Sequence, residues 1–292
     1  MIRSCQNRVA LLSLWAAVAV AGIATFNPSH ARAQGVLVVG ADLGANPYII
    51  NNPDGTISGF NVDLVTEVAK RMGRPGVQII GAPFASIFAG LEAKKYEFIA
   101  APVTLTQQRS EALLFVEGYI ATDYQFLTLK DGLKIDQLDA LRGKSVAVNN
   151  GSAQEQYLES IREKHGFTIS KYGSNADSFQ AVLSGRNDAA ISGDGNVMYA
   201  AAQNPRLAAS YRVVTQNVFS WGFRKDDEAN RTKVERTLEC MKLDGTVAKI
   251  FQKWFGVAPA PGSPSMTVFA GIGQPGFANF VADFAAPTCG KP

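Results

Sequence analysis

The sequence has very little histidine and cysteine, and this shortage excludes several kinds of chemistry. Its 292 residues include 2 histidines and 3 cysteines, and these residues do not cluster with the spacing of metal ligands. A zinc site built from cysteine and histidine, or a histidine-dependent catalytic triad, needs such residues together. We therefore expect no metal site, no cofactor and no histidine-based catalysis.

An excess of charge is also lacking once the first 33 residues are set aside. The chain carries 28 Lys and Arg against 25 Asp and Glu, and the first 33 residues contain three arginines and no acidic residue. The remainder therefore holds 25 basic and 25 acidic residues. A nucleic-acid-binding protein needs a surplus of Lys and Arg to contact phosphates. We expect no nucleic-acid partner.

Only one long apolar run occurs, and it lies at the amino terminus. Arg3 and Arg8 precede an apolar stretch at Val9–Ile23, and Ala31-Arg32-Ala33 supplies small residues for cleavage. This order is typical of a secretory signal peptide over residues 1–33, with cleavage near Ala33–Gln34. An uncleaved membrane anchor is the alternative, but the run is short for a hydrocarbon core of about 30 Å. We predict an exported protein.

The carboxyl-terminal segment differs in composition from the rest of the chain. Residues 257–292 hold six of the 13 prolines and only two charged residues, Asp283 and Lys291. A disordered tail is the alternative, but the phenylalanines of this segment make it too apolar for a solvated linker. We predict that the tail docks on the body. Because two leftover cysteines tend to pair in an oxidising compartment, we also predict a Cys240–Cys289 disulfide.

Between these ends, short apolar runs alternate with amphipathic segments. Strands are predicted at residues 36–40, 77–81, 97–101, 145–148 and 188–191. One helix is predicted with Asn61 as its cap and Gly73 as its stop, and another at Thr246–Phe255. The alternation predicts an α/β fold with largely parallel sheets and helices on both faces. In such folds ligands bind outside the carboxyl ends of the strands.

A predicted helix start at Thr106 places Arg109 in the first helical turn. A cation there opposes the helix dipole, at a cost of a few tenths to about 1 kcal/mol. An anion between Arg109 and the free first-turn N–H groups would be attracted by both. The alternative is a solvated Arg109 paired with Glu111 or Glu117, and the spacing does not decide between the two.

Two further segments offer polar groups after predicted strands. Ser152 and Glu155 form a capping box, and Gly151 allows close approach of the backbone to a ligand, although capping alone also explains Ser152. Asp194 lies between two glycines and either caps the next helix or contacts a ligand. The guanidinium, two helix starts and a carboxylate together suit a zwitterion.

Several motifs follow one another in a characteristic order over residues 36–256. They are Val38-Val-Gly-Ala-Asp42, Gly55-x-x-x-Gly59-Phe-Asn-Val-Asp63, Thr104-x-Thr106-x-x-Arg109, Asn150-Gly-Ser152, the segment 175–188, and Asp244-Gly-Thr-x-x-x-Ile-x-x-Lys-Trp-Phe-Gly256. This order resembles the polar amino-acid family of extracellular solute-binding proteins, the receptors of ABC importers.

The resemblance implies a two-lobed periplasmic-binding-protein-like fold of type II, crossed twice by the chain. We expect one lobe at residues 34–121 and 220–256 and the other at 124–216. The chain would cross between them near Thr122-Asp123 and Asn217-Val218, and an extension would follow at 257–292. It also implies a monomeric periplasmic receptor, not an enzyme. Such a receptor traps an amino acid or similar zwitterion by hinge closure and delivers it to a membrane permease.

The resemblance also assigns roles to single residues. Arg109 matches the arginine that clamps the ligand α-carboxylate, with Thr104 and Ser152 assisting, and Gly151 and Ala153 flank Ser152. Asp194 is the best match to the acidic residue that holds the α-ammonium, although that aspartate commonly stands one residue earlier, at Gly193.

Four more positions bear on the expected pocket. Ala45 stands where many relatives stack an aromatic ring, and Pro102 replaces a frequent serine and leaves only its carbonyl as acceptor. Phe84 is an aromatic wall residue or ordinary core. Asp42 matches a common family position, with structural capping as its alternative role. These departures suggest a wider or differently shaped pocket.

Two other functions stay open. An enzyme on the same scaffold, similar to periplasmic cyclohexadienyl dehydratases, would use Asp194 or Glu155 as a general acid. A soluble ligand sensor would signal by contacting a membrane protein.

Overall fold

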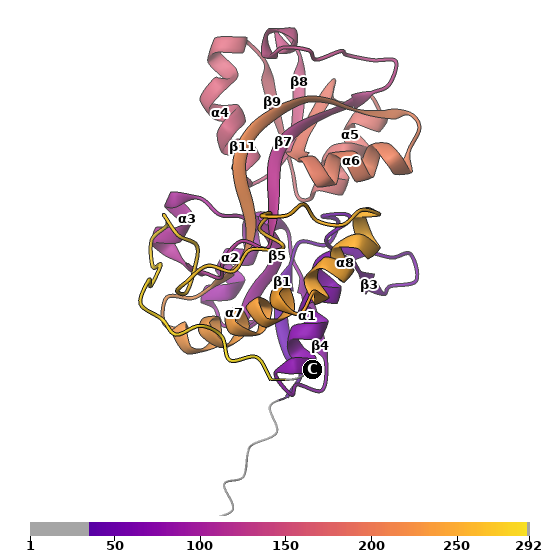
Figure 1. Ribbon diagram of the computed structural model, residues 1–292. Coiled ribbons are helices and arrows are strands. Elements are labelled where there is room, and N and C mark those ends of the chain that lie inside the picture. Colours follow the sequence, from indigo (N-terminus) through magenta and orange to yellow (C-terminus); the bar gives the residue numbers. More distant parts are fainter. Residues whose placement is uncertain (1–34, 291–292) are drawn as a thin grey trace, which may run out of the picture. The chain divides into compact units, whose positions relative to one another are not determined.

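The computed structural model describes residues 35–290, so the predicted signal peptide and its cleavage site lie outside the described residues. A nine-stranded mixed sheet organises the described chain, with strand order β4-β1-β5-β11-β7-β10-β8-β9 and β6 paired to β11 (Figure 1). The strands are β1 (Leu37–Ala41), β4 (Val77–Gly81), β5 (Phe98–Thr104), β6 (Leu114–Phe115), β7 (Ile120–Leu129), β8 (Ser145–Asn149), β9 (Thr168–Tyr172), β10 (Ala189–Gly193) and β11 (Leu207–Phe223). A separate small ribbon pairs β2 (Ile50–Asn51) with β3 (Ile57–Ser58).

Two parallel groups of strands lie within this sheet, as the alternating pattern predicts. Strands β4, β1 and β5 pair in parallel, and so do β10, β8 and β9. The long strands β7 and β11 run antiparallel to their neighbours and join the two groups. The mixed α/β class is therefore confirmed, with antiparallel strands where the groups meet.

Each strand group has its own helices and buried core. The first lobe comprises β1–β6 with α1 (Phe60–Arg71), α2 (Phe84–Glu92), α3 (Gln107–Ala112), α7 (Glu228–Leu243) and α8 (Thr246–Phe255). Its core includes Phe98 and the fully buried Trp221. The second lobe comprises β8–β10 with the 3₁₀ turn η1 (Leu138–Leu141), α4 (Ala153–His165), α5 (Asn175–Leu183) and α6 (Asp194–Gln203). Its core is built around Phe126, Val148 and Ile191.

Strands β7 and β11 pass between the lobes side by side. Thr122 pairs with Asn217, and the register shifts between Val213 and Asn217. At this irregularity the Asp123 carboxylate accepts the backbone N–H of Thr215 at 2.7 Å and that of Gln216 at 3.3 Å. Both expected crossings therefore lie opposite each other in one paired segment.

The start of α1 differs from the expectation. The helix begins at Phe60 after Gly59, whose φ is 139° and whose added Cβ would lie 2.2 Å from the Tyr48 carbonyl oxygen. Asn61 is fully buried inside the first turn and donates to the Ala100 carbonyl and the Tyr119 hydroxyl, each at 2.7 Å. The predicted cap is wrong because this side chain forms tertiary hydrogen bonds instead.

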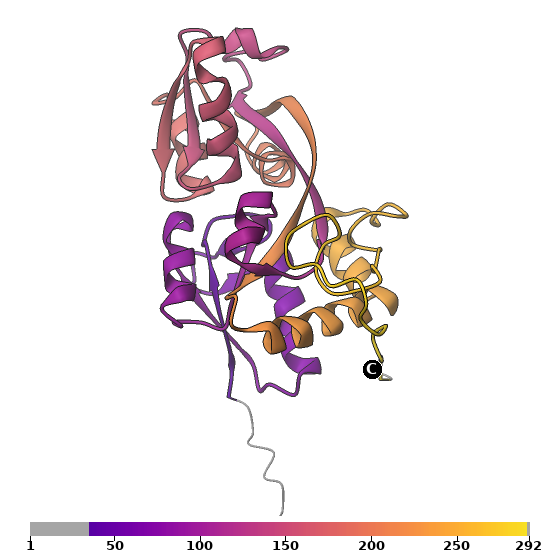
Figure 2. The ribbon, with the colours of Figure 1, turned by 90° about the vertical axis from the view of Figure 1, so that its left-hand side faces the viewer.

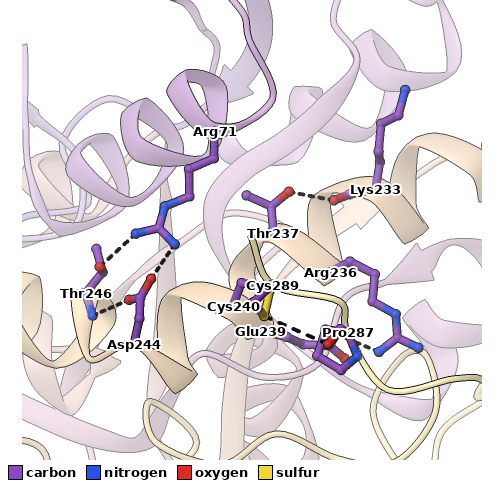
Figure 3. The surroundings of a disulfide bond; sticks show 10 residues. All are labelled: Arg71, Lys233, Arg236, Thr237, Glu239, Cys240, Asp244, Thr246, Pro287 and Cys289. Atoms are coloured by element: carbon purple, nitrogen blue, oxygen red, sulfur yellow. Dashed lines mark hydrogen bonds and ion pairs between the residues drawn. A yellow bond between two sulfur atoms is a disulfide. The ribbon is translucent and has the colours of Figure 1, made fainter. Parts of the chain in front are cut away.

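The carboxyl-terminal tail, yellow in Figure 2, follows α8 and contacts the first lobe at several points. Ser265 Oγ donates to the Tyr119 carbonyl at 2.7 Å, and Phe269 N–H donates to a Glu117 carboxylate oxygen at 3.0 Å. The predicted Cys240–Cys289 disulfide is confirmed and joins the tail to α7 (Figure 3). Within residues 35–290 no helix is both long and apolar enough to cross a membrane.

Candidate functional site

A small cavity of about 20 Å³ lies at the carboxyl ends of β1, β5, β8 and β10, between the two lobes. This is where an α/β sheet is expected to bind a ligand. The first lobe contributes Asp42, Ala45, Phe84, Pro102 and Thr104, and β11 contributes Phe219. The second lobe contributes Asn149, Ser152, Ala153, Gln154, Asn175, Ser192, Gly193 and Asn196.

Six of the residues predicted to bind the ligand line this cavity, together with Ala45 of the expected pocket wall: Asp42, Phe84, Pro102, Thr104, Ser152 and Ala153. Sequence reasoning missed several polar lining residues of the second lobe, above all Asn149, Gln154 and Asn175. The available signal was their position, because each lies at the end of a predicted strand or in the first turn of a helix. Gly151, Arg109 and Asp194 are not lining residues.

Arg109 lies beside the cavity and connects the two lobes. Its side chain leaves α3, where Thr106 Oγ1 caps the helix by accepting Arg109 N–H at 3.2 Å, as predicted. One guanidinium nitrogen donates to the Thr104 carbonyl at 2.8 Å, and another donates to the Gly151 carbonyl of the second lobe at 2.9 Å. The guanidinium therefore joins two backbone segments that flank the cavity.

No carboxylate neutralises Arg109 within residues 35–290. The alternative pairing with Glu117 is wrong, because that carboxylate binds Lys242 at 2.6 Å, and Arg109 forms no ion pair with Glu111 either. Burial lowers the pKa of Arg109 to about 10, and the rings of Phe84 and Phe88 lie 5.5 Å from its guanidinium carbon. A partly buried cation with only neutral partners favours an anionic guest.

The second helix start is ordered by the capping box. Ser152 Oγ accepts Glu155 N–H at 3.1 Å, and a Glu155 carboxylate oxygen accepts Gly151 N–H at 2.5 Å. Ala153 and Gln154 follow in the first turn of α4, where helix geometry provides no carbonyl for their N–H groups. Because both residues line the cavity, these N–H groups are available to a ligand oxygen.

Gly151 serves close packing between the lobes. Its φ is 77°, and an added Cβ would lie 3.1 Å from Cα and 3.2 Å from Cβ of Ala85 in the first lobe. Both the left-handed backbone and the short distance favour glycine here.

Asp42 faces the cavity and is bound to the opposite lobe. It is 2% exposed, and its carboxylate accepts Nδ2 of Asn149 at 2.8 Å. Burial raises the pKa of Asp42 to about 7, although the Asn149 hydrogen bond opposes the shift. Asn149 Oδ1 is buried and has no hydrogen-bond partner among residues 35–290, so it is an unused acceptor in the cavity wall.

Asp194 is placed differently from the expectation. It begins α6, and its carboxylate binds Arg212 of β11 at 2.9 Å and accepts the Asp123 N–H at 3.2 Å. The carboxylate is thus directed to the paired strands β7 and β11 and not to the cavity lining. Gly193 lines the cavity instead, and a Cβ there would meet the Thr122, Asn196 and Phe219 side chains at 2.9–3.0 Å.

The model of the bacterial extracellular solute-binding proteins, family 3, matches residues 37–257. The chain belongs to this family. The match ends where the Pro- and Gly-rich tail begins.

The matches to two curated relatives extend over nearly the whole length of each relative. The lysine/arginine/ornithine-binding periplasmic protein of Escherichia coli K12 is 27% identical over 83% of this chain and 96% of its own. PatH of Vibrio harveyi, which is named as an amino-acid ABC transporter-binding protein, is 30% identical over 83% of this chain and 97% of its own.

Two solved structures share the fold. An ancestral arginine-binding protein bound to arginine has a TM-score of 0.73 and 28% identity, covering 77% of this chain and all of its own. An ancestral amino-acid-binding protein described as a precursor of cyclohexadienyl dehydratase has a TM-score of 0.70 and 28% identity, covering 76% of this chain and 96% of its own.

Proposed function

We propose that this protein is a periplasmic binding protein of an ABC importer and takes up an amino acid or a similar small zwitterion between its lobes. The observation that carries the proposal is the environment of the Arg109 guanidinium. This guanidinium has no anionic partner in residues 35–290 and hydrogen-bonds both Thr104 and, across the cavity edge, Gly151. A receptor for carboxylates needs such a cation at the place where two lobes meet.

The ligand carboxylate would lie between Arg109, the Thr104 hydroxyl and the first turn of α4. Thr104 and Ser152 line the cavity from opposite lobes, and the N–H groups of Ala153 and Gln154 add neutral donors. Bonds between ionised and polar partners in a site removed from water are stronger than neutral ones. This end of the cavity therefore provides the affinity for any α-carboxylate.

The cationic end of the ligand would meet Asp42. Asp42 is the only ionisable side chain among the cavity-lining residues, and Asn149 Oδ1 beside it is an unused acceptor. Because Gly193 and the Arg212-bound Asp194 supply no carboxylate to the lining, an ammonium or guanidinium group would be directed to Asp42. This favours amino acids with a basic or amide side chain over acidic ones.

Hinge closure about β7 and β11 would trap the ligand. Direct hydrogen bonds join the lobes at Asn149–Asp42, Arg109–Gly151 and Asn196–Asn46, the last at 2.7 Å. A ligand that contacts both lobes stabilises this closed arrangement by its difference in affinity for the two states. The closed form would be the one presented to a membrane permease.

A dehydratase on this scaffold is the second candidate, and Asp42 is the observation that favours it. A general acid needs a pKa near the working pH, and burial raises that of Asp42 to about 7. Glu155 and Asp194 are engaged elsewhere, because Glu155 binds Lys171 at 2.5 Å and Asp194 binds Arg212. We propose that the protein is not an enzyme, since no second carboxyl lines the cavity.

Calorimetric titration of the mature protein with each of the twenty amino acids tests the proposal, with a prephenate turnover assay run in parallel. We expect saturable binding of at least one amino acid by a monomer and no turnover. Failure of all twenty to bind would contradict the receptor function, and prephenate turnover would favour the enzyme.

A further inference from the structure

The helix that carries Arg109 is too short to hold its own position. α3 spans six residues, Gln107–Ala112, whereas isolated helices below about 12–15 residues are marginal in water. Its orientation must therefore come from tertiary contacts, and any contact that fixes α3 also fixes the base of the Arg109 side chain.

Three hydrogen bonds connect α3 to the carboxyl-terminal tail. Gln107 Nε2 donates to the Gly276 carbonyl at 2.9 Å, and Ala278 N–H donates to Ser110 Oγ at 3.2 Å. Asn279 Nδ2 donates to the Ser110 carbonyl at 2.6 Å. Gln107 and Ser110 are three residues apart, so they share one face of the helix, and the tail contacts that face.

Apolar contacts extend the same interface towards the site. Phe277 of the tail packs on the cluster that contains Leu105, Leu113 and Phe84. Phe84 lines the cavity and lies beneath the Arg109 guanidinium. The tail thus contacts both α3 and the apolar group on which Arg109 rests.

The tail is itself held firmly on either side of this interface. Gly273 N–H donates to the buried Glu235 carboxylate at 2.6 Å, and Gln274 Oε1 accepts Gly118 N–H at 2.8 Å. Ile272 and Val281, which stand before and after the interface, pair with each other, and the Cys289 disulfide anchors the end of the tail. Figure 1 and Figure 2 show the tail beside α3 and along the first lobe. Because the tail is anchored on both sides of the interface, its contacts can hold α3 in a fixed position.

We propose that the tail segment Gln274–Asn279, which lies beyond the family match, is a positioning element that holds Arg109 in place through α3, with Ser110 and Asn279 as its positioning residues. The inference rests on the proposed function only in giving Arg109 a ligand to grip. The mechanical link between tail and helix stands without it.

The variant Asn279→Gly removes the side-chain donor and keeps the left-handed backbone, since Asn279 has φ 64°. The matched control is Cys240→Ser with Cys289→Ser, which frees the end of the tail and leaves residues 274–279 unchanged. The first readout is hydrogen exchange of the full-length mature protein without ligand, at the N–H groups of Ser110 and Leu113, which bond Thr106 and Arg109 carbonyls within α3.

We expect at least fivefold faster exchange at these two N–H groups in Asn279→Gly and wild-type rates in the control, even where the control lowers the urea midpoint further. Unchanged exchange in Asn279→Gly would overturn the inference. Equal acceleration in both variants would overturn it as well, because the effect would then follow general stability.

The second readout is the affinity for L-arginine as the probe. We expect a five- to tenfold loss in Asn279→Gly, no loss in the control, and no further loss when Asn279→Gly is added to Arg109→Ala. Loss of affinity that persists in the Arg109→Ala background would count against positioning. If the wild-type protein binds no amino acid, the proposed function fails while the exchange result still decides the inference.

Discussion

Asn149 Nδ2 donates to the Asp42 carboxylate at 2.8 Å, which joins the end of β8 to the end of β1 across the cavity. The bond lies between two residues that are each at most 3% exposed. It therefore ties the one ionisable lining residue of the cavity to the contact between the lobes.

Binding of a cationic amino acid should depend on pH through Asp42. Burial raises the pKa of Asp42 to about 7, so the carboxyl must lose a proton before it can bind a cation. Between pH 6 and pH 8 the ionised fraction rises about tenfold, and the L-arginine affinity should rise by about the same factor. Calorimetry at these two pH values measures the change.

The control for this experiment is a carboxylate far from the cavity. Asp42→Asn should weaken binding and remove the pH dependence, whereas the exposed Asp131→Asn should keep both. A wild-type affinity that stays constant from pH 6 to pH 8 would show that the ligand cation does not meet Asp42.

Asp194→Asn should leave ligand affinity within about twofold of wild type. Its carboxylate binds Arg212, whose side chain is 54% exposed, and exposed pairs of this kind contribute about 0–1 kcal/mol. The measurement is the same titration, supplemented by urea unfolding to detect a small loss of stability. An affinity loss greater than tenfold would place Asp194 in contact with the ligand and restore its role as the ammonium partner.

The ligand-free protein should become less stable as the pH rises from 5 to 8. Burial raises the pKa of Glu235 to about 8 and that of Glu239 to about 7, from 4.5 in each case. A raised folded-state pKa contributes stability below the unfolded pKa, and this contribution is lost as the pH rises through the folded value. Each group can contribute up to about 1.4 kcal/mol per pH unit in that window.

Neighbouring acidic side chains add to the effect of burial on the pKa values of Glu235 and Glu239. Glu117, Glu235 and Glu239 lie together, and Lys242 Nζ binds Glu117 as well as the Gly118 and Thr267 carbonyls. Urea unfolding across the pH range should show a shallower slope for Glu235→Gln than for the exposed Glu92→Gln. Identical slopes in the two variants would contradict the assignment.

Local structure was predictable where a side chain bonds a backbone group only a few residues away in the sequence. The capping residues Thr106 and Ser152 bond groups three residues away, so spacing alone predicts them. The helix at Thr246–Phe255 is confirmed with the same bounds, because its apolar residues recur at helical spacing. The disulfide was predictable because only two cysteines, Cys240 and Cys289, follow the predicted signal peptide.

The rest could not be predicted, because it depends on partners distant in the sequence. Asp194 at the start of α6 binds Arg212 of β11, and Asn61 binds Ala100 and Tyr119. Neither side chain is therefore free for the local role that its position suggested. The hydrogen bond of Arg109 to Gly151 spans 42 residues and exists only when the two lobes meet. Such contacts follow from the register of β7 against β11 and not from any local pattern.

The central claim is that Arg109 binds the carboxylate of the ligand. The most direct test is to titrate L-arginine and its decarboxylated analogue agmatine into the wild-type protein and into Arg109→Ala. We predict that wild type binds L-arginine at least a hundredfold more tightly than agmatine, and that Arg109→Ala removes this preference. Equal affinity of wild type for the two compounds, or a preference that survives in Arg109→Ala, would contradict the claim.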